Sequence, residues 1–192
     1  MKNTFAVAAV LAMTLTFCGS ASAQAQAQAK DAPKTVASIL DAGVKGVEGE
    51  FVPAAEAMPE DKYGFAPTNG EFKGVRTFAQ QIKHVAAVNY MVAAAILQEK
   101  PPVELGGENG PDNIKSKADI MKFIKDSYAY AHKAVGTITP DNYAGEVPSP
   151  FGQGKTTRMR LGILITSHSF DHYGQMVEYL RMNGIVPPAS RQ

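Results

Sequence analysis

The chain has 192 residues, with 19 lysines and arginines against 18 aspartates and glutamates, so its formal net charge is +1. This length is enough for one domain with a sizeable core. The balanced charge gives no indication of a partner such as nucleic acid or an anionic membrane surface.

The first 23 residues, MKNTFAVAAVLAMTLTFCGSASA, have the order of a secretory signal. A basic start at Lys2 precedes an apolar run from Phe5 to Phe17, and small residues end the segment at Ala23. This order predicts cleavage after Ala23, and the apolar run is too short for a permanent membrane anchor. We therefore expect an exported protein, periplasmic if the host has two membranes.

The only cysteine, Cys18, lies inside this predicted signal. Without the signal the chain would have no thiol, which excludes a cysteine nucleophile, a thiolate metal site and c-type haem attachment. A lipid anchor on Cys18 is the alternative, but the bulky Phe17 before it favours ordinary cleavage. Loss of Lys2 would leave 18 basic and 18 acidic residues, a formal charge of zero.

Residues 24–33, QAQAQAKDAP, are polar and repetitive, which is typical of a disordered tether. We expect one domain over residues 34–192. Its first helix is predicted from about Thr35 to Ala57, and Pro53 leaves the position of its end open, because proline inside a helix kinks or stops it. Apolar residues recur there every three or four positions: Val36, Leu40, Val44, Val47 and Phe51.

A second helix is predicted over residues 69–99, because Thr68 to Glu71 fits a capping box. Its stripe is Val75, Phe78, Ile82, Val85, Asn89, Val92 and Ile96. The third helix should begin near Ser116, a good N-cap with Asp119 at the third position. Its stripe is Ile120, Ile124, Tyr128, Ala131 and Val135.

The fourth helix is predicted from about Thr157 to Met182, and Asn183-Gly184 with two later prolines ends it. Long irregular segments join the helices, at residues 100–113 and 136–154. The second could cover an opening with aromatic residues such as Phe151, although anchoring the loop is the commoner role. With no alternating strand pattern of useful length, the chain is predicted to be all-α, a four-helix bundle with long irregular inter-helix loops.

Two histidines continue the apolar stripe of the fourth helix, which reads Leu161, Ile165, His168, His172, Gln175 and Tyr179. Side chains four residues apart on a helix have Cβ atoms about 5–6 Å apart, so two imidazoles can share one metal ion. The alternatives are that each histidine is hydrogen-bonded in the core, or that the stripe is rotated and both are exposed.

His84, beside the stripe of the second helix, could complete a face of three nitrogens with one or more open metal positions. It could equally be a boundary residue that bonds a loop carbonyl. His132 is expected at the solvent edge, outside the site.

The segments FAQQIKHVAAVNY and HSFDHYGQMVEYLRMNGIVPP resemble the DinB-like (DinB/YfiT-like) metal-binding four-helix bundles, whose last helix carries H-x-x-x-H-x-G-Q. The resemblance extends from about Thr35 to Ala189. It implies that His84, His168 and His172 bind one divalent metal ion. Zinc is the expected ion, with nickel or iron as alternatives.

Members of that family with known activity include thiol-dependent S-transferases and relatives of maleylpyruvate isomerase. A metal on three imidazoles could activate water or a thiol, so hydrolysis or thiol transfer on an unidentified small molecule is the predicted chemistry. Export is atypical for enzymes that use cytosolic thiols. The H-E-x-x-H and E-x-x-H motifs of other metal sites are absent.

Three residues are candidates for support of the ligands: Asp171 and Gln175 beside the histidine pair, and Asn89, which could line a pocket or fix helix register. A non-catalytic, stress-related bundle whose ion holds two helices together is the main alternative function. A plain bundle for protein contacts is a third. A homodimer is compatible with each of them.

Overall fold

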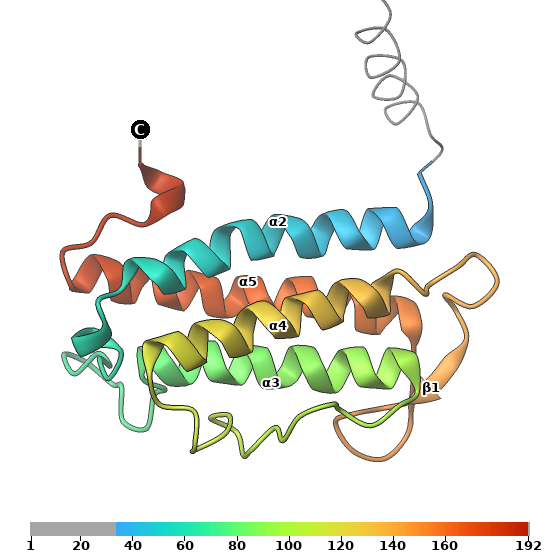
Figure 1. Cartoon of the computed structure of the whole chain (residues 1–192), viewed down its shortest axis with the longest axis horizontal. Helices are drawn as coiled ribbons and strands as arrows, with labels where there is room; N and C mark the ends of the chain where they lie inside the picture. Colours follow the sequence, from blue (N-terminus) through green and yellow to red (C-terminus); the bar gives the residue numbers. More distant parts are fainter. Residues whose placement is uncertain (1–33, 192) are drawn as a thin grey trace, which may run out of the picture. The chain divides into compact units, whose positions relative to one another are not determined.

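The computed structural model describes residues 34–191, so the predicted signal and tether at 1–23 and 24–33 lie outside the described part. The described part is built on four helices, which confirms the predicted all-α four-helix bundle (Figure 1). They are α2 (Val36–Ala57), α3 (Phe78–Leu97), α4 (Lys117–Val135) and α5 (Arg158–Met182). Two short 3-10 helices follow α2 and α5, at Glu60–Lys62 and Pro188–Ser190.

The predicted start of the second helix is wrong, because α3 begins at Phe78 rather than near residue 69. Its N-cap is Thr77, whose hydroxyl accepts from the backbone of Gln80 at 3.3 Å. The Gln80 side chain accepts in turn from the backbone N–H of Thr77 at 2.8 Å, which completes a capping box. Gly74, with φ at +80°, has a left-handed conformation, so a regular helix cannot run through this position.

The other predicted helices begin and end within a residue or two of the observed ones, and α2 continues through Pro53 to Ala57. A small antiparallel hairpin was not predicted: β1 (Glu146–Pro148) pairs with β2 (Lys155–Thr157) in the connection before α5. Within residues 34–191, none of the helices combines the length and apolarity that a bilayer span requires.

Each helix packs mainly against two others: α3 and α2 both contact α4 and α5. The connection between α3 and α4 runs back along the bundle, so these two helices are parallel (Figure 1). Their contacts agree: near the C-terminal end of both, the Tyr130 hydroxyl donates to the Glu99 carboxylate at 2.6 Å. In contrast α5 is antiparallel to α3, because Tyr179 near its end bonds the carbonyl of Arg76 just before α3.

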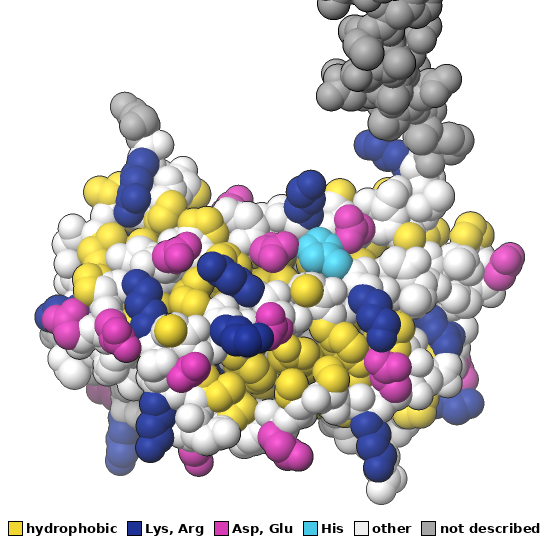
Figure 2. All heavy atoms as spheres, in the orientation of Figure 1, with side chains coloured by type: hydrophobic (Ala, Val, Ile, Leu, Met, Phe, Trp, Pro, Cys, Tyr) yellow, Lys and Arg dark blue, Asp and Glu magenta, His cyan; other side chains and the backbone are white. Residues whose placement is uncertain are grey.

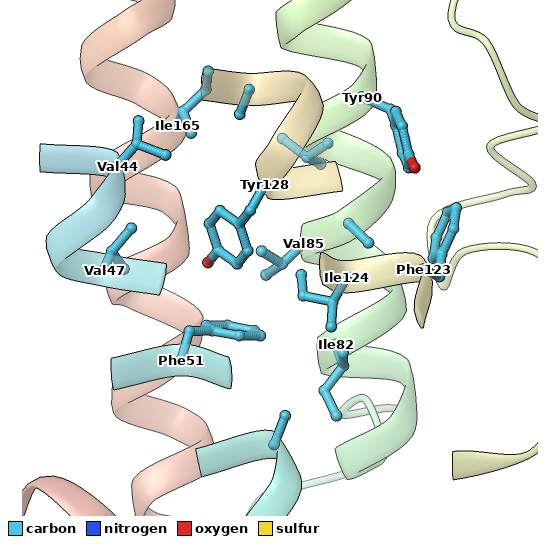
Figure 3. Close-up of a cluster of buried hydrophobic side chains, with 14 of the residues drawn as sticks. Val44, Val47, Phe51, Ile82, Val85, Tyr90, Phe123, Ile124, Tyr128 and Ile165 are labelled. Atoms are coloured by element: carbon cyan, nitrogen blue, oxygen red, sulfur yellow. The ribbon is translucent and has the colours of Figure 1, made fainter. Parts of the chain in front are cut away.

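Tyr128 lies at the centre of the core, between α2 and α3 (Figure 3). Its ring meets that of Phe51 edge to face, with centroids 6.1 Å apart. Both side chains are fully buried, and burial of the apolar Phe51 side chain contributes about 1.5–3 kcal/mol. The surrounding side chains come from all four helices and include Val44, Val47, Ile82, Val85, Ile124 and Ile165. On the face shown in Figure 2, basic and acidic side chains are interspersed.

Candidate metal centre

Three imidazoles from two helices converge on one point of the bundle. His84 comes from α3, and His168 and His172 lie one turn apart on the antiparallel α5. One ring nitrogen from each lies within 4.8 Å of the other two. The Nε2 atoms of His84 and His168 are 3.2 Å apart. Tetrahedral zinc with Zn–N bonds of about 2.0–2.1 Å holds its nitrogens about 3.3 Å apart, so this spacing suits a shared ion.

The ring of His84 is oriented by a loop carbonyl. Its Nδ1 lies 2.7 Å from the carbonyl oxygen of Glu108, and because a carbonyl only accepts, Nδ1 carries the proton. The Nε2 atom of His84 is therefore unprotonated, and its lone pair faces the α5 histidines. Both predicted roles of His84 are thus compatible: it bonds a loop carbonyl through one nitrogen and joins the cluster through the other.

The loop that supplies this carbonyl is held on α3 by two cations. Arg76 donates to the Glu108 carbonyl at 3.3 Å and forms an ion pair with its carboxylate at 2.9 Å. The buried Lys83 donates to the carbonyl of Pro111 at 2.8 Å. The position of the Glu108 carbonyl is therefore fixed from both sides.

Two glycines let this loop lie directly on the helix. Gly110 has φ at +75°, and a Cβ there would meet the Cβ of Lys83 at 2.6 Å. Gly106 has φ at +68°, and a Cβ there would meet the backbone of Gly110 at the same distance. The sequence GGENG at 106–110 therefore combines the conformational freedom and the close approach that the loop requires.

The ring of His172 is oriented by a side chain that the sequence did not identify, the fully buried Gln81. The His172 Nδ1–H donates to Gln81 Oε1 at 2.5 Å. Gln81 then donates to Gln175 Oε1 at 2.9 Å, and Gln175 donates to the Asp171 carboxylate at 3.4 Å. Every donor in this chain points toward the carboxylate. Such a chain fixes the tautomer of a ligating histidine and makes its other nitrogen more basic.

All three histidines are held in the neutral form. Burial, followed by the neighbouring His84, lowers the pKa of His168 to about 4. Burial and the two other imidazoles lower the pKa of His172 to about 3. The pKa of His84 is also lowered, by burial and then by Arg76. Each ring therefore offers a lone pair at neutral pH, which is the form that binds a metal.

A cation fits this cluster better than a proton does. His84 and His172 each direct an unprotonated Nε2 inward, because their Nδ1 atoms donate to oxygens. A proton on His168 Nε2 could be shared with either His84 or His172 but not with both, whereas one divalent ion can accept a lone pair from all three rings. Within residues 34–191 the Nδ1 of His168 is buried without a hydrogen-bond partner. The donor set therefore suits a nitrogen-binding metal.

Of the three predicted supporting residues, two lie beside the histidine cluster and one does not. Gln175 and Asp171 are joined to His172 through Gln81, as described above. Asn89 donates to Ser127 Oγ of α4 at 3.3 Å, so its amide faces away from the histidines, toward helix packing.

His132 lies at the partly exposed edge of the bundle and outside the histidine cluster, as predicted. Its side chain is 27% exposed and lies between α4 and α2. Its two nitrogens meet the carboxylates of Asp41, at 2.5 Å, and Glu48, at 3.0 Å.

A cavity of about 510 Å³ reaches the cluster at His168. It lies where the hairpin connection covers the first turns of α5, and its lining includes Phe151, Lys155, Arg160, Leu161 and Leu164. The open side of the histidine cluster is thus next to a space large enough for a small molecule.

Comparison with known proteins agrees with this architecture. The profile of the DinB superfamily matches residues 45–176, which include all three histidines. A DinB-like protein (YjoA) of Bacillus subtilis superposes with a TM-score of 0.57 at 16% identity, over 80% of this chain and 99% of that chain. A DinB-like protein of Bacillus cereus gives 0.56 at 14% identity, over 74% and 89%. No curated protein matches. Since the profile match covers more than half of the sequence, the chain belongs to the DinB superfamily.

Proposed function

We propose that this protein is an exported metalloprotein that binds one divalent ion through His84, His168 and His172. Zinc is the expected ion, with nickel or iron as alternatives. We further propose that the bound ion serves hydrolysis of a small molecule or transfer of a thiol to it. The observation that carries the proposal is the convergence of three neutral imidazoles whose free nitrogens face one point.

The residues around the cluster have defined tasks in this proposal. The Glu108 carbonyl and the Gln81 amide hold two ligand rings in one tautomer before the ion binds. Asp171, at the end of the chain through Gln175, supplies the negative charge that stabilises the donor polarity. A divalent ion held in this way supplies Lewis acidity, which lowers the pKa of bound water or of a thiol.

The second candidate is an ion that only ties α3 to α5. The three histidines come from these two helices alone, so a structural ion would stabilise their contact. The cavity that ends at His168 favours the catalytic proposal, because a purely structural ion needs no space for a ligand beside it.

Metal analysis of the purified protein tests the ligand assignment. We expect about one equivalent of metal in the wild type and its loss in His84→Ala, His168→Ala and His172→Ala. His132→Ala is the matched control, since it removes the remaining imidazole of the chain from a different helix pair and should keep the metal. Full retention in any of the three ligand variants would contradict the assignment of that residue.

Cobalt substitution separates a catalytic ion from a structural one. A site with an open position should change its visible spectrum when azide or a small thiol such as mercaptoethanol is added. A spectrum that neither compound alters would show a closed site and support the structural role.

A further inference from the structure

We propose that the cavity beside His168 binds small organic carboxylates with an apolar body, the carboxylate lying at Arg160 and the reactive group at the histidine cluster. The inference rests on the proposed function, because it assigns the substrate class of the same metal centre. It depends on the shape, the charge and the apolar lining of the cavity.

The shape of the cavity follows the axis of α5. Arg160, Leu164 and His168 are spaced four residues apart, so they share one face of that helix. Eight residues of helix separate the first from the last, a rise of about 12 Å. Both ends of this row line the same cavity, together with Phe151 and Lys155 from the hairpin connection. An elongated molecule therefore fits it better than a compact one.

The charge of the cavity is positive at the end remote from the cluster. Arg160 and Lys155 are its only charged lining residues, and both are cations. Lys155 already pairs with Glu146 at 3.1 Å, on the exposed surface. Among the described residues the Arg160 guanidinium has neither an ion pair nor a hydrogen bond. Only the backbone N–H of Arg160 is bonded, to the hydroxyl of Thr157, the N-cap of α5. A planar guanidinium suits a carboxylate because it can bond both oxygens at once.

Apart from Ser149 and Thr156, the rest of the lining between the cations and His168 is apolar. Leu161 is 2% exposed and forms part of the core wall, and Leu164 is half-buried beside it. The ring of Phe151 is 57% exposed, which is unusual for a phenylalanine. It is followed by Gly152 and Gly154, both at positive φ, in a connection that needs these glycines to turn back into β2. Phe151 is thus placed to cover the apolar body of a ligand between the cation and the histidines.

Binding of ω-phenylalkanoates tests this assignment. Phenylacetate, 4-phenylbutanoate and 6-phenylhexanoate vary the distance between the carboxylate and the ring, and the corresponding alcohols lack only the charge. Titration calorimetry should show at least one acid that binds about tenfold more tightly than its alcohol. Arg160→Gln should remove this preference, while Arg181→Gln, an exposed arginine at the other end of α5, should keep it.

Two results would overturn the inference: no acid whose affinity depends on Arg160, or inorganic phosphate that competes as well as the best acid. The first would show that the arginine holds no carboxylate, and the second would show a general oxyanion site without an apolar subsite. Metal content, measured on the same samples, keeps this outcome separate from the proposed function. A protein with one equivalent of metal and no carboxylate preference fails only here, whereas metal-free wild type fails the proposed function.

Discussion

The amide oxygen of Gln81 lies 2.5 Å from Nδ1 of His172, and both side chains are buried between α3 and α5. This bond sets the direction in which the free nitrogen of His172 points. We expect Gln81→Leu to weaken metal binding about 10–100-fold, the usual cost of losing an outer-shell partner of a ligating histidine. Competition with a chromophoric chelator gives the affinity.

Asn89→Leu is the matched control for this change. It also removes a buried amide from α3, but one that bonds Ser127 rather than a histidine. We expect it to alter the free energy of unfolding and to leave metal affinity unchanged. Equal losses of affinity in both variants would show that Gln81 acts through general stability and not through His172.

The loop on α3 gives a second prediction. We expect Gly110→Ala to lower the free energy of unfolding by about 1–3 kcal/mol, because its φ is +75° and its Cβ would collide with Lys83. Metal affinity should fall as well, since the loop carries the carbonyl that orients His84. Gly107→Ala, with nothing within 4 Å of its Cβ, should change stability by no more than about 0.5 kcal/mol. Chemical denaturation distinguishes the two, and a Gly110→Ala protein as stable as Gly107→Ala would contradict the close approach.

His132 gives a prediction for pH dependence. Burial lowers the pKa of this imidazole, but hydrogen bonds to Asp41 and Glu48 outweigh burial, and the net pKa is raised. A raised folded-state pKa means that the protonated form stabilises the fold. This contribution is complete below the unfolded value of about 6.5 and is lost as pH rises through the folded-state pKa.

We therefore expect His132→Gln to destabilise the protein more at pH 5.5 than at pH 9, by an amount of the order of 0.2–1 kcal/mol that is typical of partly exposed ion pairs. Denaturation curves of both proteins at both pH values give the comparison. A difference that is the same at pH 5.5 and pH 9 would mean that the imidazole does not titrate against the α2 carboxylates.

Removal of the metal should lower the melting temperature. A ligand that binds only the folded state stabilises it by about 2.7 kcal/mol when present at 100 times its dissociation constant. We expect added zinc to raise the melting temperature of chelator-treated wild type and to leave that of His84→Ala unchanged. A similar rise in the variant would place the responsible ion elsewhere.

Much of the fold follows from apolar spacing. The apolar stripes predicted where α2, α4 and α5 lie in the sequence, because each of these helices buries one continuous face. The second helix was placed too early because two capping boxes occur in succession, at Thr68 and at Thr77. Local sequence does not decide between them. The hairpin escaped prediction because its strands have three residues each, too few for a visible alternation.

The histidine cluster was visible in the sequence, but its supports were not. Gln81 precedes Ile82 of the apolar stripe, and it becomes buried only because α5 packs on that side of α3. The order of helices in the bundle, which the stripe does not reveal, decides this. The Glu108 carbonyl is a backbone group in an irregular loop, so no side chain in the sequence indicates it. The glycines at 106 and 110 were the one sequence signal for a tight turn there.

The parallel course of α3 and α4 sets a minimum length for the chain between them. A helix of 20 residues, such as α3, is about 30 Å long, and the connection must span this length before α4 can start. Residues 98–116 would reach about 63–68 Å if fully extended, so roughly half of this reach exceeds what the crossing requires. Short deletions here would leave enough chain to join the two helices, so the bundle could still assemble. They would first disrupt the turn that carries Glu108. We therefore expect a chain shortened in this crossover to fold but to bind the proposed metal ion less tightly.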